Sequence, residues 1–269
     1  MHIGVTLRNM GPQSTAATMR ACACAAEAHG FESVWITDHL AIPPDDAEGS
    51  GGRYTDTLTT LAWLGGLTTR IRLGTGALIL PYRPALPTAK AIATLHELTG
   101  ERLLLGVGVG WMEAEFRALG VNRHDRGRLT DDCLQFLADC FSQPVVERNG
   151  QAFLFDPRPP APPIYVGGRA PHALARAQRF GHGWLPMVKS PETLRQDLVP
   201  WREMHADTPS PRLAVTAMAF VPNDRPDDML RLRDAYRALD IERLVCTVRY
   251  ETADQYTRQL DALARLLAE

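Results

Sequence analysis

An acid and a histidine, Asp38 and His39, stand directly after the apolar segment 33–37. A histidine can give up or accept a proton near neutral pH, and a carboxylate beside it can orient its ring or shape its loop. If segment 33–37 is a strand of a parallel barrel, the pair lies at the carboxyl end of that strand, where such barrels carry their active sites. We therefore predict that Asp38 and His39 belong to a catalytic site.

Glycines follow the next two apolar segments. Gly76 and Ala77 come after RIRLGT, and glycines at the end of a strand allow a bulge or the close approach of a planar ligand. Gly108 and Gly110 belong to GVGVG, which fits the dinucleotide-binding pattern GxGxxG poorly because Trp111 stands where the third glycine belongs. A simple strand-to-loop turn is the alternative interpretation of Gly76 and Ala77, and the GVGVG segment alone does not establish a binding site.

A third glycine segment favours the binding of a phosphate group. Gly167, Gly168 and Arg169 precede Pro171, which is suited to the first turn of a helix. Free backbone N–H groups at the start of a helix bind anions, and an arginine beside them adds a charged hydrogen bond. This segment is therefore predicted to hold a phosphate.

The whole chain alternates short apolar segments with longer helical ones, a pattern typical of parallel βαβ units. The predicted strands are residues 3–7, 33–37, 71–74, 103–107, 164–166, 183–185, 213–220 and 243–247. The predicted helices are residues 15–29, 57–69, 85–98, 125–141, 171–180, 191–205, 227–239 and 253–267. Eight strands, each with its own helix, indicate a (β/α)8 TIM barrel and disfavour an open Rossmann-type sheet.

The regular alternation is interrupted once, before the fifth strand. Residues 145–163 contain a predicted hairpin around Asn149 and Gly150, followed by the proline-rich segment DPRPPAPP. No linker or composition shift divides the chain, and barrels of this class usually have roughly 250 residues. We therefore expect residues 1–269 to form a single α/β barrel domain with a short insertion.

The composition is that of an ordinary globular protein. The net charge of -2 gives no overall attraction to nucleic acid or to an anionic membrane, and no apolar run is long enough to span a bilayer. Five cysteines without a signal-like N-terminal segment predict a cytoplasmic protein without a disulfide framework. Cys22 and Cys24 point to nearly opposite sides of a predicted helix, and Cys133 and Cys140 suit a core, so no metal site is expected.

Several stretches together resemble a known family. They are FESVWITDHLAIP, TLTTLAWLGGLTTRIRLGTGALILPYR, ATLHELTGERLLLGVGVGWMEAEFRALGV and PPIYVGGRAPHALARAQRFGHGWLP. Their order and spacing over residues 31–185 are similar to the luciferase-like monooxygenase superfamily, and specifically to its coenzyme F420-dependent oxidoreductase branch. The agreement of several independent blocks is more specific than any one motif.

The resemblance implies a barrel that holds a tricyclic ring at its carboxyl-terminal mouth. A bulge after the third strand would support the ring through a non-prolyl cis peptide, here Gly76-Ala77. Asp38 and His39 would lie beside the ring, and Gly167, Gly168 and Arg169 beside the phosphate-bearing tail. Gly108 and Gly110 would complete the glycine segments around the cofactor.

The cofactor determines the reaction. With F420, the resemblance implies hydride transfer to or from a small substrate such as an imine, an activated alkene or an alcohol, with His39 donating a hydrogen bond or proton. With FMN, it implies a monooxygenase. A non-catalytic binding or partner subunit is a third alternative, which the intact Asp38-His39 pair disfavours. We expect no metal, nucleic acid or membrane partner, and a homodimer is one option for assembly.

The sequence departs from the family in two places. The insertion before the fifth strand is short where relatives often carry a longer segment that shapes the substrate pocket. Trp111 stands where some relatives use a catalytic acid, and the nearby Glu113 and Glu115 are expected on a helix surface. The candidates to line the barrel mouth are Arg53, Tyr54, Trp63, Tyr82 and Trp184.

Overall fold

Eight parallel strands close into a barrel in the computed structural model, which describes residues 1–186, 188–204, 213–222 and 224–267. They are β1 (His2–Thr6), β2 (Ser33–Ile36), β3 (Arg72–Thr75), β5 (Leu103–Gly108), β8 (Ile164–Gly167), β9 (Gly183–Leu185), β10 (Ala214–Phe220) and β11 (Arg243–Thr247). Each strand pairs in parallel with the next, and β11 pairs with β1. The ring is therefore closed, as predicted, and the open Rossmann-type sheet is excluded.

The predicted strands are confirmed, with each end within one residue of its expected place. A parallel barrel strand is covered on both faces, which requires an apolar segment rather than an alternating one. β5 shows this directly, because all its residues, LLLGVG, are buried. A short additional strand, β4 (Leu78–Ile79), continues the line of β3 and pairs with the end of β5.

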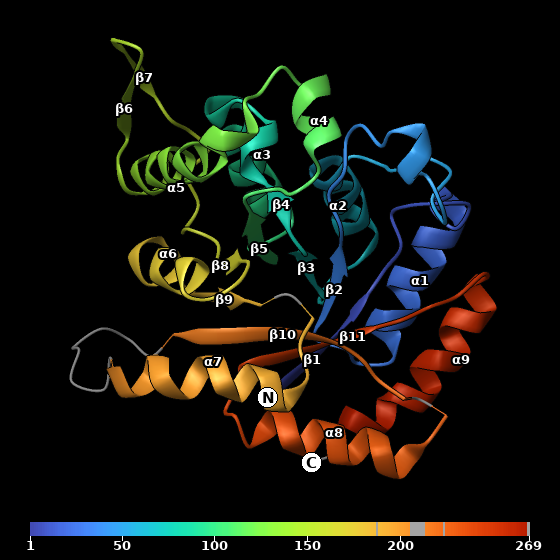
Figure 1. Ribbon diagram of the computed structural model, residues 1–269. Coiled ribbons are helices and arrows are strands. Elements are labelled where there is room, and N and C mark those ends of the chain that lie inside the picture. The colour runs from blue at the N-terminus through green and yellow to red at the C-terminus, as the bar shows by residue number, and fades with distance from the viewer. Residues whose placement is uncertain (187, 205–212, 223, 268–269) are drawn as a thin grey trace.

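Helices follow the strands and cover the outside of the barrel (Figure 1). They are α1 (Ala16–Ala28), α2 (Thr57–Leu67), α3 (Ala85–Leu98), α5 (Arg126–Ser142), α6 (His172–Phe180), α7 (Pro191–Met204), α8 (Pro226–Arg237) and α9 (Ala253–Leu263). The predicted helix 191–205 ends on residue 205, which lies outside the described residues. Among the described helices, none has the length and apolar character needed to cross a membrane.

Side-chain caps explain where several helices begin. Thr15, Asp56 and Thr252 precede α1, α2 and α9, and each side chain accepts a hydrogen bond from the backbone N–H three residues later. These bonds satisfy N–H groups that the first turn of a helix leaves free. One short helix, α4 (Glu113–Ala118), was not among the predicted elements and becomes important at the site.

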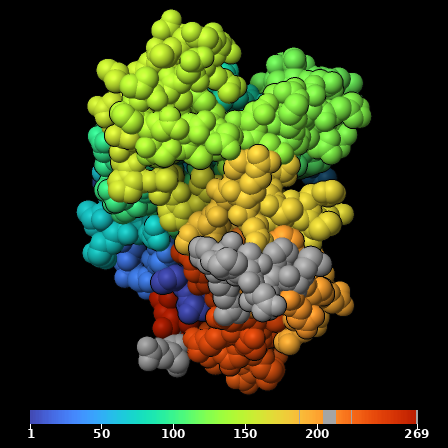
Figure 2. Space-filling model, turned by 90° about the vertical axis from the view of Figure 1, so that its left-hand side faces the viewer, coloured from blue at the N-terminus to red at the C-terminus, as the bar shows by residue number. Residues whose placement is uncertain are grey.

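The predicted insertion is confirmed as a hairpin of β6 (Val145–Arg148) and β7 (Gln151–Leu154), with Asn149 and Gly150 in the turn at positive φ. Figure 1 shows it projecting from the end of α5, away from the barrel. From the side, the segment that carries the hairpin and the segment that contains α4 form two projections with a hollow between them (Figure 2).

The interior of the barrel is organised around Trp35 of β2. Its indole packs edge-on against Tyr165, with ring centroids 6.3 Å apart, and both side chains are buried. A Cβ atom added to Gly74 on the neighbouring strand β3 would lie 2.2 Å from Cδ2 of Trp35. The indole therefore leaves no room for a side chain at position 74, and only glycine fits there.

We expect Gly74→Ala to be destabilising because neither the buried indole nor the strand backbone has room to move. Overpacking of this kind typically costs about 1–3 kcal/mol. Urea unfolding of the variant would measure the loss, with Gly66→Ala on α2 as the control, since an added Cβ there meets nothing within 4 Å. Equal stability of the Gly74→Ala variant and the parent would contradict the packing argument.

Candidate active site

Asp38 is buried at the end of β2, and its carboxylate is saturated with hydrogen bonds. It accepts hydrogen bonds from both terminal nitrogens of Arg83, each at 2.7 Å. It also accepts one from the hydroxyl of Thr57 at 2.9 Å and one from the backbone N–H of Ile79 at 2.8 Å. None of its hydrogen bonds within the described chain reaches the side chain of His39. Of the two roles considered for Asp38, its contacts match the shaping of the loop and not the orientation of the histidine.

The chain bulges between β3 and β4, as predicted. Gly74 pairs with Leu104 and Leu78 pairs with Val107, so four residues of one strand span three of the other. The Gly76-Ala77 peptide bond inside this bulge is cis. Just after the bulge, the backbone N–H of Ile79 donates a hydrogen bond to Asp38, so the loop after β2 and the bulge after β3 are tied together at the mouth of the barrel.

His39 lies at this mouth, and only one of its two ring nitrogens is hydrogen-bonded to a described residue. Its Nδ1 atom is 2.8 Å from Oε2 of Glu115. The ring of Tyr54 lies at a centroid distance of 4.9 Å, and Trp111, which is 64% exposed, meets the imidazole edge-on at 6.3 Å. Nε2 makes no hydrogen bond with any described residue, so it is the ring nitrogen available to a ligand.

Glu115 is fully buried and accepts four hydrogen bonds. Oε1 accepts the backbone N–H groups of Leu40 and Ala41 at 2.6 and 3.0 Å, and Oε2 contacts His39 and the hydroxyl of Tyr82, at 2.9 Å. Burial favours a higher pKa for this carboxyl group, but the bonds from His39 and the two amides outweigh it and lower the pKa to about 2. Burial and the neighbouring Glu115 raise the pKa of Tyr82 well above its usual value, so its hydroxyl keeps its proton.

The prediction that Glu115 lies on a helix surface was wrong, whereas Glu113 is exposed as expected. Residues two apart in a helix are separated by about 200° around its axis, so one of the two carboxylates faces outward and the other inward. Phe116, beside Glu115, is also buried and shows which face is internal. No signal in the sequence separates the two, because Glu113 follows the apolar Met112 just as Glu115 precedes Phe116.

Packing explains the glycines after β5. A Cβ atom on Gly108 would lie 2.9 Å from Cδ1 of Ile79, and one on Gly110, at φ +76°, would lie 2.9 Å from the ring of Phe116. These contacts bring the end of β5 against the segment that follows the bulge. The proposed contact of Gly108 and Gly110 with a cofactor remains a prediction.

The glycine segment after β8 leaves donors free. Gly167 lies against Val107, whose carbonyl oxygen would be 2.8 Å from an added Cβ, and Gly168 has φ +127°. The backbone N–H groups of Arg169 and Ala170 donate to no described residue, and the exposed Arg169 side chain has no described partner. The segment therefore offers two amides and a guanidinium group just ahead of α6.

The residues predicted to line the mouth differ in their exposure and contacts. Tyr54 packs on His39, and Trp63 is 37% exposed on α2. Tyr82 and Trp184 are buried, so neither lines an open mouth. The guanidinium group of Arg53 is hydrogen-bonded to Ser14, in the loop between β1 and α1.

The sequence matches the family described as luciferase-like monooxygenase over residues 1–267. The chain belongs to this family. Membership confirms the resemblance that the four sequence stretches indicated, and the closed barrel with its bulge after β3 agrees with it.

This luciferase-like chain is similar to F420-dependent dehydrogenases and to monooxygenases. It is 33% identical to the F420-dependent hydroxymycolic acid dehydrogenase of Mycobacterium tuberculosis over 178 residues, which cover 61% of this chain and 47% of the relative. The chain spans less than two thirds of the length of the first curated relatives it matches.

Two solved structures share the fold at low sequence identity. The monooxygenase RslO1 from Streptomyces bottropensis has a TM-score of 0.77 and 19% identity, with 99% of this chain and 98% of that chain covered. An F420-dependent secondary alcohol dehydrogenase in complex with an F420-acetone adduct has a TM-score of 0.78 and 16% identity, with 98% of each chain covered.

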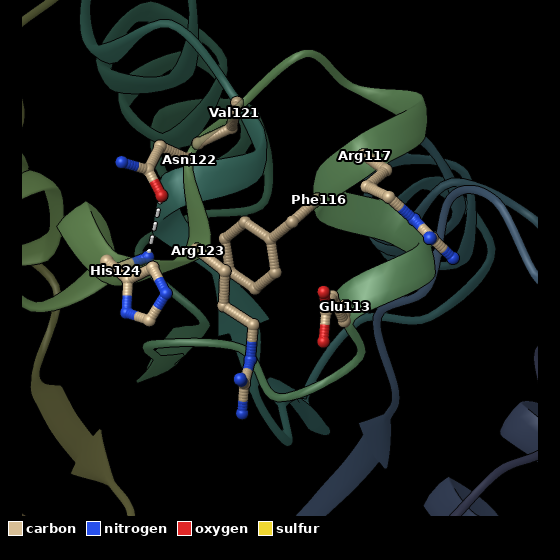
Figure 3. Close-up of a pocket in the computed structure, with 7 residues that line it drawn as sticks. All are labelled: Glu113, Phe116, Arg117, Val121, Asn122, Arg123 and His124. Atoms are coloured by element: carbon tan, nitrogen blue, oxygen red, sulfur yellow. Dashed lines mark hydrogen bonds between the residues drawn. The ribbon is translucent and has the colours of Figure 1, made fainter.

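The luciferase-like chain also has a cavity of about 190 Å³ between α4 and the 3-10 turn Arg123–Asp125 (Figure 3). Its lining consists of Glu113, Phe116, Arg117, Val121, Asn122, Arg123 and His124. Phe116 points into it from α4. Because His39 and Glu115 are not among the lining residues, we assign the chemistry to the barrel mouth and not to this cavity.

Proposed function

We propose that the protein is an oxidoreductase that uses coenzyme F420 and acts on a small organic substrate, either an imine, an activated alkene or an alcohol. The observation that carries this proposal is the free Nε2 atom of His39 at the barrel mouth, where Asp38, the residue before it, is hydrogen-bonded to the segment after the bulge at Gly76 and Ala77. Relatives about 30% identical that are F420-dependent dehydrogenases support the same assignment.

The residues present fit a flat ring with an anionic tail. Gly76 and Ala77 are partly exposed at the mouth and would support the ring, with Asp38 holding the chain beyond them. The free amides of Arg169 and Ala170, together with the Arg169 side chain, would bind a phosphate. When bound, coenzyme F420 supplies or accepts a hydride.

His39 would handle the proton that accompanies this transfer. General acid–base catalysis by a positioned histidine contributes roughly 10²- to 10⁴-fold to rate. The partly exposed ring of Tyr54 and the exposed ring of Trp111 flank His39 and would cover an apolar part of the substrate, with Nε2 facing its polar atom. Within the described residues, the side-chain hydrogen bonds of Asp38 all go to Thr57, Ile79 and Arg83, so its role is to position the segment after the bulge.

An FMN-dependent monooxygenase is the second candidate. Its support is structural likeness to the monooxygenase RslO1 and to an FMN complex of a type II Baeyer-Villiger monooxygenase, with TM-scores of 0.77 and 0.76. A non-catalytic cofactor-binding or partner subunit is the third. We favour an enzyme because His39 has a buried carboxylate partner that a passive binding surface does not need.

Direct titration of the purified protein with F420 and with FMN tests the cofactor. We expect F420 to bind more tightly, and Arg169→Ala to weaken F420 binding by roughly 10- to 100-fold, because a hydrogen bond to a charged group contributes about 1.5–3 kcal/mol. Arg179→Ala is the matched control, since Arg179 is exposed on α6, the helix that follows Arg169, and stacks on Phe180. Tight FMN binding without F420 binding would overturn the cofactor assignment.

A further inference from the structure

We propose that Glu115 is a positioning residue that keeps the proton of neutral His39 on Nδ1 and so makes Nε2 the atom that exchanges protons with the substrate. The exchange with a substrate rests on the proposed function. The placement of the proton is a property of the protein alone and follows from the contacts of the Glu115 carboxylate.

The ionised state of Glu115 decides the direction of its bond to His39. With a pKa of about 2, the carboxylate is charged at neutral pH and can only accept hydrogen bonds. The atom 2.8 Å away, Nδ1 of His39, must therefore carry a hydrogen. In neutral imidazole one nitrogen is a donor and the other an acceptor, so Nε2 carries the lone pair.

Glu115 also fixes where the imidazole points. Its Oε1 atom holds the amides of Leu40 and Ala41, the two residues after His39, while Oε2 holds the ring itself. The backbone that follows His39 and the imidazole ring of His39 are thus hydrogen-bonded to the same buried carboxylate. The hydroxyl of Tyr82 shares Oε2, and because it keeps its proton, it donates and does not compete for the hydrogen on Nδ1.

A purely structural anchor for the loop is the alternative role, and one substitution distinguishes the two. In Glu115→Gln, the two amides of Leu40 and Ala41 need an acceptor at the Oε1 position, so the amide oxygen of the glutamine stays there. The amide nitrogen then faces Nδ1 and donates to it. The loop keeps its anchor, but the proton of neutral His39 moves to Nε2, the inverse of the natural tautomer.

Nitrogen NMR of the cofactor-free protein, labelled in its histidine rings, measures this directly. The His39 signals are assigned by their loss in His39→Gln, because the chain has 8 histidines. In the parent we expect Nδ1 to be protonated and Nε2 to be unprotonated, and in Glu115→Gln we expect the reverse. Tyr82→Phe keeps the carboxylate and should therefore show the same protonation pattern as the parent. A bare Nδ1 in the parent, or an unchanged tautomer in folded Glu115→Gln, would overturn the proposal.

Turnover supplies the second measurement. Glu115→Gln should lower kcat by at least roughly tenfold with little change in KM, because a wrong tautomer impairs proton transfer more than binding. Tyr82→Phe should lower it much less. If F420 and FMN both fail to bind, the proposed function fails while the tautomer result is unaffected. Full turnover of the Glu115→Gln variant with bound cofactor would refute the positioning role alone.

Discussion

Substitution of His39 by glutamine is expected to lower kcat by roughly 10²- to 10⁴-fold while the protein stays folded and continues to bind its cofactor. Glutamine can occupy the same space and donate a hydrogen bond to Glu115, but it cannot transfer a proton near neutral pH. The natural ring has only one hydrogen bond to a described residue, so little of the local structure depends on it.

The measurement is turnover against a panel of alcohols, imines and activated alkenes, followed by the absorbance of the deazaflavin. His124→Gln is the matched control, because His124 is exposed and its ring has no described hydrogen-bond partner. Cofactor titration of both variants separates loss of chemistry from loss of binding. A His39→Gln variant that retains turnover within about threefold of the parent would remove His39 from the proton-transfer step.

The fold was predictable because its signals are local. Each barrel strand is a short apolar segment followed by a helical one, and the regular order of eight such units leaves few other architectures. The helix whose bounds were not predicted, α4, has only six residues, EAEFRA, too few to show a period. Local periodicity therefore identified the scaffold but not the short element that completes the site.

The site was predictable only in part, because its contacts join distant segments. Adjacency in sequence left two roles for Asp38, orienting His39 or shaping the loop, and the side chain that contacts His39 is Glu115, 76 residues away. Neighbouring side chains at the end of a strand point in different directions, and Asp38 turns inward to Arg83. The location at the end of β2 could be read from the sequence, but the pairing required the barrel to bring β2 and α4 together.

The Asp38-Arg83 pair makes the largest stability prediction. The side chain of Asp38 has no exposed surface and that of Arg83 is 12% exposed. Asp38→Asn would place an amide N–H against the guanidinium group and remove the buried counter-charge. Breaking a buried pair in this way typically costs about 3–5 kcal/mol, a large part of the total stability of a domain.

Asp56→Asn provides a matched control on the same guanidinium group. Asp56 contacts Arg83 at 3.1 Å, but its side chain is 43% exposed, so its contribution should stay below about 1 kcal/mol. Both free energies of unfolding come from urea titration. Equal losses in the two variants would mean that burial does not strengthen the Asp38 pair, and the tie between the loop after β2 and the bulge after β3 would then need another explanation. A much larger loss for Asp38→Asn would instead establish that the acid of the Asp38-His39 pair serves to hold the site in shape, which leaves proton transfer to the histidine.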